Sequence, residues 1–371
     1  MLKVEWQIFG LFMMLKKKIT AALMEWHNTQ NNREMPWKGE KDPYKIWLSE
    51  VILQQTRVEQ GRTYYENFTH KYPTIQHLAA DKDENVFKLW EGLGYYNRCK
   101  NLLFTARFVT NELKGRFPDT YADIVALKGV GPYTAAAIAS FAYNEPYAVV
   151  DGNVFRVLSR VFNIDTPTDS TEGKQLFTDL ANEVLDKKQP GAFNQAIMDF
   201  GATICKPMAP ACAVCPLQKL CEARQHGRVS MLPVKNKVLQ KKTRWLTWFK
   251  LQAEGKTLVH KRSSRDIWEN LHEFYLVEAT EKTTWTRDLV TQWCWNQLDV
   301  KKAEVISISG VLSQQLTHQT IKAQFIEVQL PHIPPSLTEY DWLSTKEIDQ
   351  LAFPRLINLW LDPKKRDSLL F

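Results

Sequence analysis

The stretch Leu127-Lys128-Gly129-Val130-Gly131-Pro132-Tyr133-Thr134 decides the fold of the first half of this 371-residue chain. Pro132 stands where a second helix would begin, and proline is tolerated as the first residue of a helix. A short helical pattern precedes the stretch. Gly129 and Gly131 permit backbone shapes that other residues resist, so N–H groups can point outward at a helix start. The pattern predicts a helix–hairpin–helix that binds DNA phosphate without reading sequence. An ordinary connection between two helices is the alternative interpretation.

Helical spacing of apolar residues extends over 18–205 on both sides of this hairpin. One helix is predicted to begin at Asp42-Pro43. Another is predicted over 154–161, with Arg156 and Arg160 on the face opposite its valines and leucine. The first half of the chain is therefore expected to be all-helical.

Beyond Cys221 the amino-acid composition changes, first to a polar, basic linker and then to a region rich in β-branched and aromatic residues. Residues 245–262, with Glu254-Gly255 at their centre, are predicted to form a hairpin. Apolar residues alternate over 321–325 and then one position out of step over 326–330, as a β-bulge would produce. Helical patterns return near 344–361, so a smaller α+β domain is expected. The expected division is an extension 1–17, a helical domain 18–225, a linker 226–243 and an α+β domain 244–371.

The composition fits a globular protein, with 44% hydrophobic and 24% charged residues and a net charge of +7. A mild basic excess suits a polyanion partner but also many proteins without one. The N-terminal apolar run over 8–15 is too short to span a bilayer, and Lys16-Lys17-Lys18 follow it, which is the wrong order for a secretory signal. A dispensable extension, with translation starting at Met14, is the favoured explanation of this run, and a peripheral membrane anchor is the alternative. The chain is expected to be cytoplasmic and monomeric, without a membrane partner.

Four of the six cysteines crowd into a proline-rich loop at positions 205, 212, 215 and 221. Such thiolates can surround one soft metal centre. Structural zinc fits the spacing poorly because zinc sites usually pair two short Cys-x-x-Cys knuckles. Two disulfides fit the expected cytoplasm poorly. The spacing favours an iron–sulfur cluster held by Cys205, Cys212, Cys215 and Cys221, whereas Cys99 and Cys294 are expected to be small packed residues.

The hairpin, the cysteine loop and Val149-Val150-Asp151-Gly152-Asn153 occur in the order typical of the endonuclease III superfamily, which this sequence resembles. The resemblance implies a [4Fe–4S] cluster at the cysteine loop and a catalytic role for Asp151. The alternative for Asp151 is a helix cap. Members that cleave the strand carry a lysine just after the hairpin, where this chain has Tyr133, which cannot form a Schiff base.

The segment Trp47-Leu48-Ser49-Glu50-Val51-Ile52-Leu53-Gln54-Gln55-Thr56 resembles the adenine-excising, MutY-type glycosylases within that superfamily. Further matches are Gly92-Leu93-Gly94-Tyr95-Tyr96 and Phe193-Asn194-Gln195-Ala196. The resemblance implies that Glu50 is the general acid at adenine and that Asp151 stabilises or traps the sugar cation. A solvated Glu50 is the alternative. Tyr133 and Asn153 are expected to position these groups.

By the same resemblance the partner is double-stranded DNA with adenine opposite 8-oxoguanine or guanine, and the enzyme is monofunctional. A Nudix-like C-terminal domain is expected to recognise 8-oxoguanine through Leu316-Thr317-His318. No metal-binding glutamate cluster occurs over 281–298, so nucleotide hydrolysis there is not expected. The residues expected at DNA are Arg33, Trp37, Gln55, Thr56, Tyr95, Gly129, Gly131, Thr317 and His318.

Two other functions stay open from the sequence. One is a relative that removes a different base. The other is a cluster-bearing DNA-binding or redox-sensing protein in which Asp151 is only a cap and Glu50 is solvated. Glu50 and Asp151, both at family positions, argue against the second.

Overall fold

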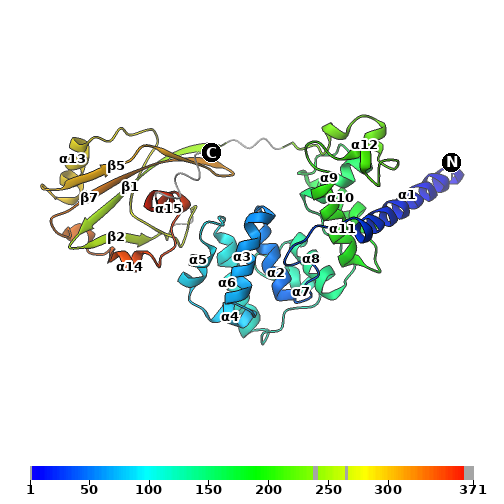
Figure 1. Ribbon diagram of the computed structural model, residues 1–371, viewed down its shortest axis with the longest axis horizontal. Coiled ribbons are helices and arrows are strands. Elements are labelled where there is room, and N and C mark those ends of the chain that lie inside the picture. Colours follow the sequence, from blue (N-terminus) through cyan, green and yellow to red (C-terminus); the bar gives the residue numbers. More distant parts are fainter. Residues whose placement is uncertain (1, 237–240, 264–265, 363–371) are drawn as a thin grey trace. The chain divides into compact units, whose positions relative to one another are not determined.

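The computed structural model describes residues 2–236, 241–263 and 266–362 (Figure 1). Its contacts divide the chain into two compact units, one of Met1–Ala80 with Asn101–Lys237 and one of Asp81–Lys100 with Val238–Phe371. Residues 81–100, which we expected to belong wholly with the helical part, group with the C-terminal residues instead. Each unit is described by itself below.

The first unit is helical, as expected. Pro43 and Pro132 begin helices as predicted, and the Asp42 side chain caps the first of these by accepting from the Tyr44 N–H at 2.9 Å. The helices of this unit are α1 (Leu2–Thr29), α2 (Pro43–Leu53), α3 (Val58–Lys71), α4 (Ile75–Ala80), α7 (Tyr121–Ala126), α8 (Pro132–Tyr143), α9 (Gly152–Val161), α10 (Thr171–Val184), α11 (Pro190–Thr203) and α12 (Glu222–Gln225), with short 3-10 turns η1 (Cys212–Val214) and η2 (Val229–Met231).

The core of this unit joins helices that are far apart in sequence. Leu23 and Trp26 of α1 belong to the same buried cluster as Leu158 of α9 and Phe200 of α11, and the rings of Trp26 and Phe200 meet edge to face at 5.3 Å. This cluster sets the direction of α9 and α11, because burying large apolar side chains is the main driving force for helix packing.

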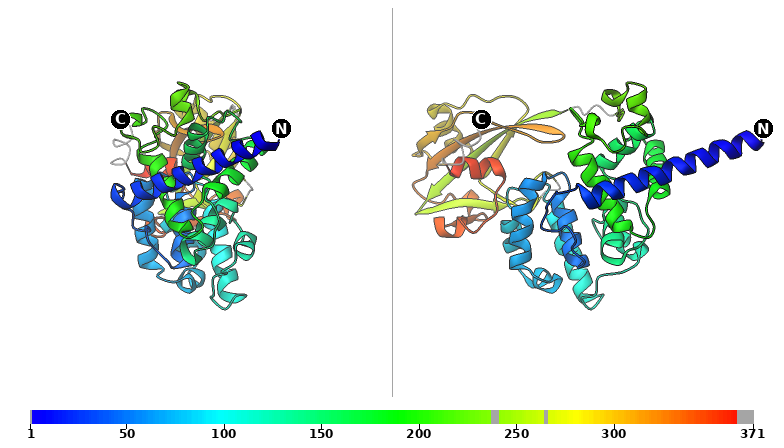
Figure 2. Two further views of the ribbon diagram at one scale, coloured as in Figure 1. Left: turned by 90° about the vertical axis from the view of Figure 1, so that its right-hand side faces the viewer. Right: turned by 45° about the vertical axis from the view of Figure 1, so that its right-hand side comes forward.

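Figure 2 shows α1, in dark blue, extending from the other helices of this unit at its N-terminal end. The side chains of residues 2–13, which include most of the apolar run, lie outside the description. Lys16 was expected in the extension 1–17, but it is buried and pairs with Glu183. None of the helices in the described part of the chain has the length and apolar character that a bilayer span requires.

The second unit contains an eight-stranded mixed sheet whose main path runs β3-β2-β1-β7-β5, with β4 beside β1, β6 beside β7 and β8 beside β2. The predicted hairpin is confirmed, with Glu254 and Gly255 both at positive φ in its turn. The elements are α5 (Asp83–Trp90), β1 (Lys242–Ala253), β2 (Lys256–Lys261), β3 (His272–Glu273), β4 (Tyr275–Ala279), α13 (Arg287–Leu298), β5 (Glu304–Ile308), β6 (Leu312–Gln315), β7 (Gln319–Gln329), η3 (Pro335–Leu337), β8 (Asp341–Leu343), α14 (Thr345–Ile348) and α15 (Arg355–Leu361); α6 (Asn97–Asn111) begins here and ends in the first unit.

Helices contribute to the cores on both faces of this sheet, which explains its runs of consecutive buried residues. Phe249 packs in one cluster with Cys294 of α13, whereas its neighbour Trp248 stacks on Phe325, which in turn stacks on Trp360 of α15 at 4.8 Å. The predicted bulge occurs on a different strand from the one expected. β7 pairs with β1 without interruption, and the extra residue is Ile306 on β5.

Candidate active site

Helices α1, α2, α3, α8, α9 and α11 and the segment over residues 33–41 of the first unit line a cavity of about 420 Å³. That volume lies in the range of sites for small organic ligands. The cavity brings together residues that the sequence predicted from separate motifs: Arg33, Trp37, Glu50, Thr56, Tyr133, Asp151 and Asn153.

Glu50 reaches this cavity from α2, whose neighbouring turns bury Trp47, Leu48 and Val51. Its side chain is only 6% exposed, so the alternative of a solvated glutamate is wrong. Burial raises the pKa of Glu50 to about 7, while a hydrogen bond with Tyr133 lowers it and the nearby Asp151 raises it. The carboxyl group can therefore carry a proton near neutral pH.

Asp151 caps α9 and also lines the cavity, so the capping interpretation and the catalytic one are compatible. Its Oδ1 accepts from the Val154 N–H at 2.8 Å, and its Oδ2 accepts from the Asn153 amide at 2.7 Å. Burial raises the pKa of Asp151, while these two donors and the charge on Arg156 act in the opposite direction. Hydrogen-bond donors to both oxygens favour the ionised form of this carboxyl group. An ionised carboxylate could stabilise a positive charge that develops on a sugar.

Tyr133 stands at the second position of α8, directly after the hairpin, and hydrogen-bonds Glu50. Burial raises the pKa of its hydroxyl well above the usual range, so the group remains a neutral hydrogen-bonding partner. Lys128 does not line the cavity; its ammonium group lies over the Phe104 ring, 4.1 Å from the centroid.

The hairpin itself has the backbone that its glycines were expected to provide. Gly129 has φ of +79°, and a Cβ there would lie 2.7 Å from Cβ of Asn101, so glycine is required for both reasons. Gly131 caps α8 without a side-chain bond, which leaves N–H groups at the start of that helix available to an anion.

The four clustered cysteines line one further cavity together with Arg160. None of the six cysteines forms a disulfide, and Cys99 and Cys294 are buried as expected. Within the described residues, no three His, Cys, Asp or Glu side chains lie close enough to hold a single metal ion.

Arg156 and Arg160 were expected on the other face of their helix, yet both are buried. Arg156 donates to the Asn153 side chain at 2.7 Å and to the Cys205 carbonyl at 2.7 Å. Arg160 donates to Cys205 Sγ at 3.4 Å and to the carbonyls of Lys206 and Pro207. The loop carbonyls make these burials possible, because buried guanidinium groups need acceptors.

The remaining predicted DNA contacts lie outside the cavity. Gln55 is exposed, with φ of +59°, in the turn after α2. Within the second unit, Tyr95 has φ of +51°, is 43% exposed, and its hydroxyl hydrogen-bonds Oγ1 of Thr317. His318 is exposed, and its carbonyl accepts from the Lys242 N–H at 3.2 Å.

Two residues near the cavity were missed as site residues. Gln195 lines it from α11, although the sequence offered this residue only as a family match. Asp199, one turn further along α11, is completely buried and pairs with Arg33. The sequence did offer a signal for Asp199, because it lies between the apolar residues Ile197 and Phe200 of one predicted helix. An acid that is buried among apolar residues normally has a charged or hydrogen-bonding partner.

Comparisons with known proteins agree with the two folds. Residues 48–182 match the HhH-GPD superfamily of base excision DNA repair proteins, and residues 247–362 match a NUDIX domain. The adenine DNA glycosylase of Buchnera aphidicola subsp. Acyrthosiphon pisum (strain APS) is 30% identical over 362 residues, which cover 95% of this chain and 99% of that protein. The Homo sapiens adenine DNA glycosylase is 44% identical over 214 residues, 55% of this chain and 39% of that one.

A solved thermostable thymine-DNA glycosylase is also similar, with 30% identity and a TM-score of 0.54. It covers 57% of this chain and 98% of its own, whereas the Buchnera adenine glycosylase extends over nearly all of both chains. The helical fold is common to the thymine and the adenine glycosylases, so it does not distinguish them. The match over both domains of this chain is found with the adenine glycosylase. The chain belongs to the adenine DNA glycosylase family.

Proposed function

We propose that the cavity of the first unit receives an adenine that is mispaired with 8-oxoguanine or guanine and extruded from the duplex, and that the enzyme is monofunctional. The observation that carries this proposal is the grouping of the buried Glu50 with Tyr133 and Asp151 around one cavity. An enzyme that reacts at a base must take it out of the stack and receive it in a pocket that fits it.

Glu50 acts as the general acid. It gives its proton to N7 of adenine, which makes the base a better leaving group as the C1′–N9 bond breaks and its electron pair moves to the base. Positioned proton transfer of this kind contributes about 10²–10⁴-fold. Tyr133 holds the Glu50 carboxyl in place through the hydrogen bond between them.

Asp151 acts on the sugar. As the bond breaks, positive charge develops at C1′, and the carboxylate either stabilises that charge or adds to C1′. Water then attacks C1′ and loses a proton, leaving free adenine and an abasic site. Tyr133 stands where a lyase would need a lysine, so the strand is not cut by this enzyme.

The hairpin and the cysteine loop serve DNA binding. Gly129 and Gly131 present backbone N–H groups to a phosphate. Cys205, Cys212, Cys215 and Cys221 fit a [4Fe–4S] cluster, since all four line one cavity and Arg160 already donates to the sulfur of Cys205. When bound, the cluster would cross-link the loop and hold its basic residues toward DNA.

The second unit recognises the base opposite the adenine. Helix α13 carries Asp288 as its one carboxylate, so it lacks the glutamate pair that a hydrolytic Nudix site needs for a metal ion. Tyr95 and Thr317, which we expect at DNA, are hydrogen-bonded to each other in this unit. We assign lesion contact to this pair and His318.

The test is incubation with duplexes that each carry one defined mismatch, followed by strand scission with and without hot alkali. Adenine opposite 8-oxoguanine should be released fastest, and the strand should break only after alkali. Scission without alkali would contradict a monofunctional enzyme, and equal rates opposite guanine and 8-oxoguanine would contradict lesion recognition.

A further inference from the structure

Asp199 is a buried carboxylate without a role in the chemistry proposed above. Its side chain is completely inaccessible, and it stands on α11 one turn after Gln195, which lines the cavity. Its backbone carbonyl accepts from the Thr203 hydroxyl at 2.8 Å, an ordinary bond within a helix. The side chain is therefore the unusual feature.

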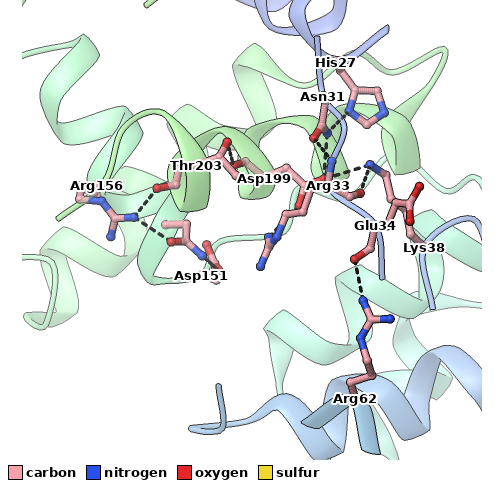
Figure 3. A network of polar contacts seen from close by, with 12 residues as sticks. His27, Asn31, Arg33, Glu34, Lys38, Arg62, Asp151, Arg156, Asp199 and Thr203 are labelled. Atoms are coloured by element: carbon pink, nitrogen blue, oxygen red, sulfur yellow. Dashed lines mark hydrogen bonds and ion pairs between the residues drawn. The ribbon is translucent and has the colours of Figure 1, made fainter. Parts of the chain in front are cut away.

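Three donors converge on this carboxylate from the segment over residues 31–38 (Figure 3). Asp199 Oδ1 accepts from Arg33 Nη1 at 2.8 Å, while Oδ2 accepts from the Asn31 amide at 2.9 Å and lies 3.4 Å from Lys38 Nζ. Lys38 also donates to the Arg33 carbonyl at 2.8 Å. One carboxylate thus binds both ends of the segment that forms a wall of the cavity.

The same segment is held from its other side by Arg62 of α3, which donates to the Glu34 carbonyl at 3.0 Å. The side chains of Arg33 and Lys38 are about three-quarters buried and both line the cavity. Two cations next to one carboxylate leave a local excess of positive charge even in the intact enzyme. Without Asp199 that excess would grow where little water can screen it.

We propose that Asp199 is a positioning residue for adenine excision: it holds Arg33 and Lys38 on the cavity wall and offsets their charge, so that the cavity keeps Glu50 protonated. This rests on the proposed role of Glu50. The other ionisable groups that line the cavity are Asp151, His27, Glu40, Lys41 and Tyr133, and all of them remain in a variant of Asp199. An uncompensated ammonium group in the same cavity would favour the ionised Glu50, which has no proton to give.

The test compares Asp199→Asn with Asp179→Asn, a matched control in which an exposed carboxylate of α10 loses its charge. Single-turnover release of adenine opposite 8-oxoguanine is measured from about pH 5.5 to 9, across the range in which Glu50 titrates. Binding is measured separately with a duplex whose adenosine carries an uncleavable 2′-fluoro sugar. Thermal unfolding checks that each variant folds.

For Asp199→Asn we expect a loss of roughly tenfold to a hundredfold near pH 8, as displacement of a pocket wall can produce, with duplex binding retained. The midpoint of the fall in rate with rising pH should move to lower pH. Adding Lys38→Met to this variant should restore part of the rate and return the midpoint toward its original value. A uniform loss at every pH, or a double variant no faster than Asp199→Asn, would overturn the proposal.

If Asp199→Asn does not fold, Lys38→Met alone decides the matter. Removing one of the two cations should move the midpoint to higher pH, and an unchanged or lower midpoint overturns the proposal. Failure of the proposed function looks different. In that case the unmodified enzyme and Asp179→Asn would themselves release no adenine, whereas normal release by these two and by Asp199→Asn would defeat only the role of Asp199.

Discussion

Glu50 in the first unit and Glu273 in the second are both buried, at 6% and 3% exposure, yet their pKa values shift in opposite directions. Burial raises the pKa of Glu50 to about 7, the hydrogen bond with the Tyr133 hydroxyl lowers it only in part, and the nearby Asp151 raises it further. Burial also opposes ionisation of Glu273, but hydrogen bonds from His260, Trp248 and Arg262, with the arginine charge, bring its pKa below the usual value.

The difference teaches that burial alone does not make a catalytic acid. The Glu273 carboxylate accepts from Arg262 at 2.6 Å and from the Trp248 indole at 3.0 Å, so it is a fixed anion that ties β3 to β1 and to Arg262. Glu50 has no cation in direct contact among the groups that shift its pKa. A buried acid with neutral or acidic neighbours can exchange a proton near pH 7, whereas one with cationic neighbours serves structure.

The largest expected effect is on excision by Glu50→Gln. The amide keeps the shape of the side chain but has no acidic proton to transfer, so single-turnover release of adenine should fall by about 10²–10⁴-fold. Binding of the mismatched duplex should change little. Glu59→Gln, in the exposed first turn of α3, is the control. Near-normal excision by Glu50→Gln would remove this residue from the mechanism.

In the unmodified enzyme the rate of adenine release should fall as pH rises through about 7, the pKa of Glu50, because the ionised group has no proton to transfer.

Asp151→Asn should come next, with a loss of about 10²–10³-fold in excision, typical for removal of one electrostatic stabiliser. Asparagine also caps helices well and can still accept from the Val154 N–H, so the unfolding temperature should hardly change. Loss of activity together with loss of folding would indicate that Asp151 is mainly a cap. Single-turnover kinetics and a thermal melt on the same preparation separate the two.

The same comparison predicts opposite effects on stability. The pKa of Glu50 is raised in the folded protein, so its contribution to stability is present below about pH 4.5 and is lost as pH rises through about 7. Above that pH the cost is about 3 kcal/mol, at roughly 1.4 kcal/mol for each pH unit between the two pKa values. Glu50→Gln should therefore be more stable than the unmodified protein at pH 8 and not at pH 4, as measured by denaturant unfolding.

Glu273→Gln should instead lower the free energy of unfolding at pH 7 by about 1–3 kcal/mol, because the buried Arg262 loses one of its two charged partners and keeps only Asp266. The pKa of Glu273 is lowered, so its stabilising effect is present above about pH 4.5 and disappears as pH falls through the folded pKa. Unfolding followed at pH 7 and in acid should show the difference only at pH 7. Glu339→Gln, at an exposed position, serves as the control.

The smallest effect is expected for Tyr95→Phe, which removes the hydroxyl that bonds Thr317 and keeps the ring. One hydrogen bond contributes about 0.5–1.5 kcal/mol, so affinity for adenine opposite 8-oxoguanine should fall by a few fold. Affinity for adenine opposite guanine should fall less. An equal loss for both duplexes would separate this pair from recognition of the lesion.

Local sequence was enough to predict several elements because their signals act over a few residues. Asp42-Pro43, Gly131-Pro132 and Glu254-Gly255 begin or turn elements where expected, since caps, proline and turn residues act on the backbone beside them. The bulge was placed on the wrong strand because an apolar pattern reports which face is buried, and not which of two paired strands carries the extra residue.

The sequence by itself determined the order of the two folds, the family, and the identity of Glu50, Tyr133 and Asp151 as candidates, because each stands in a short motif with its own spacing. Only the tertiary structure decided that these residues share one cavity, that Arg156 and Arg160 are buried, and that Asp199 binds Arg33 and Lys38. The physical reason is that pKa values and buried ion pairs depend on neighbours from distant helices. Residue spacing along a single helix does not reveal which neighbours those will be.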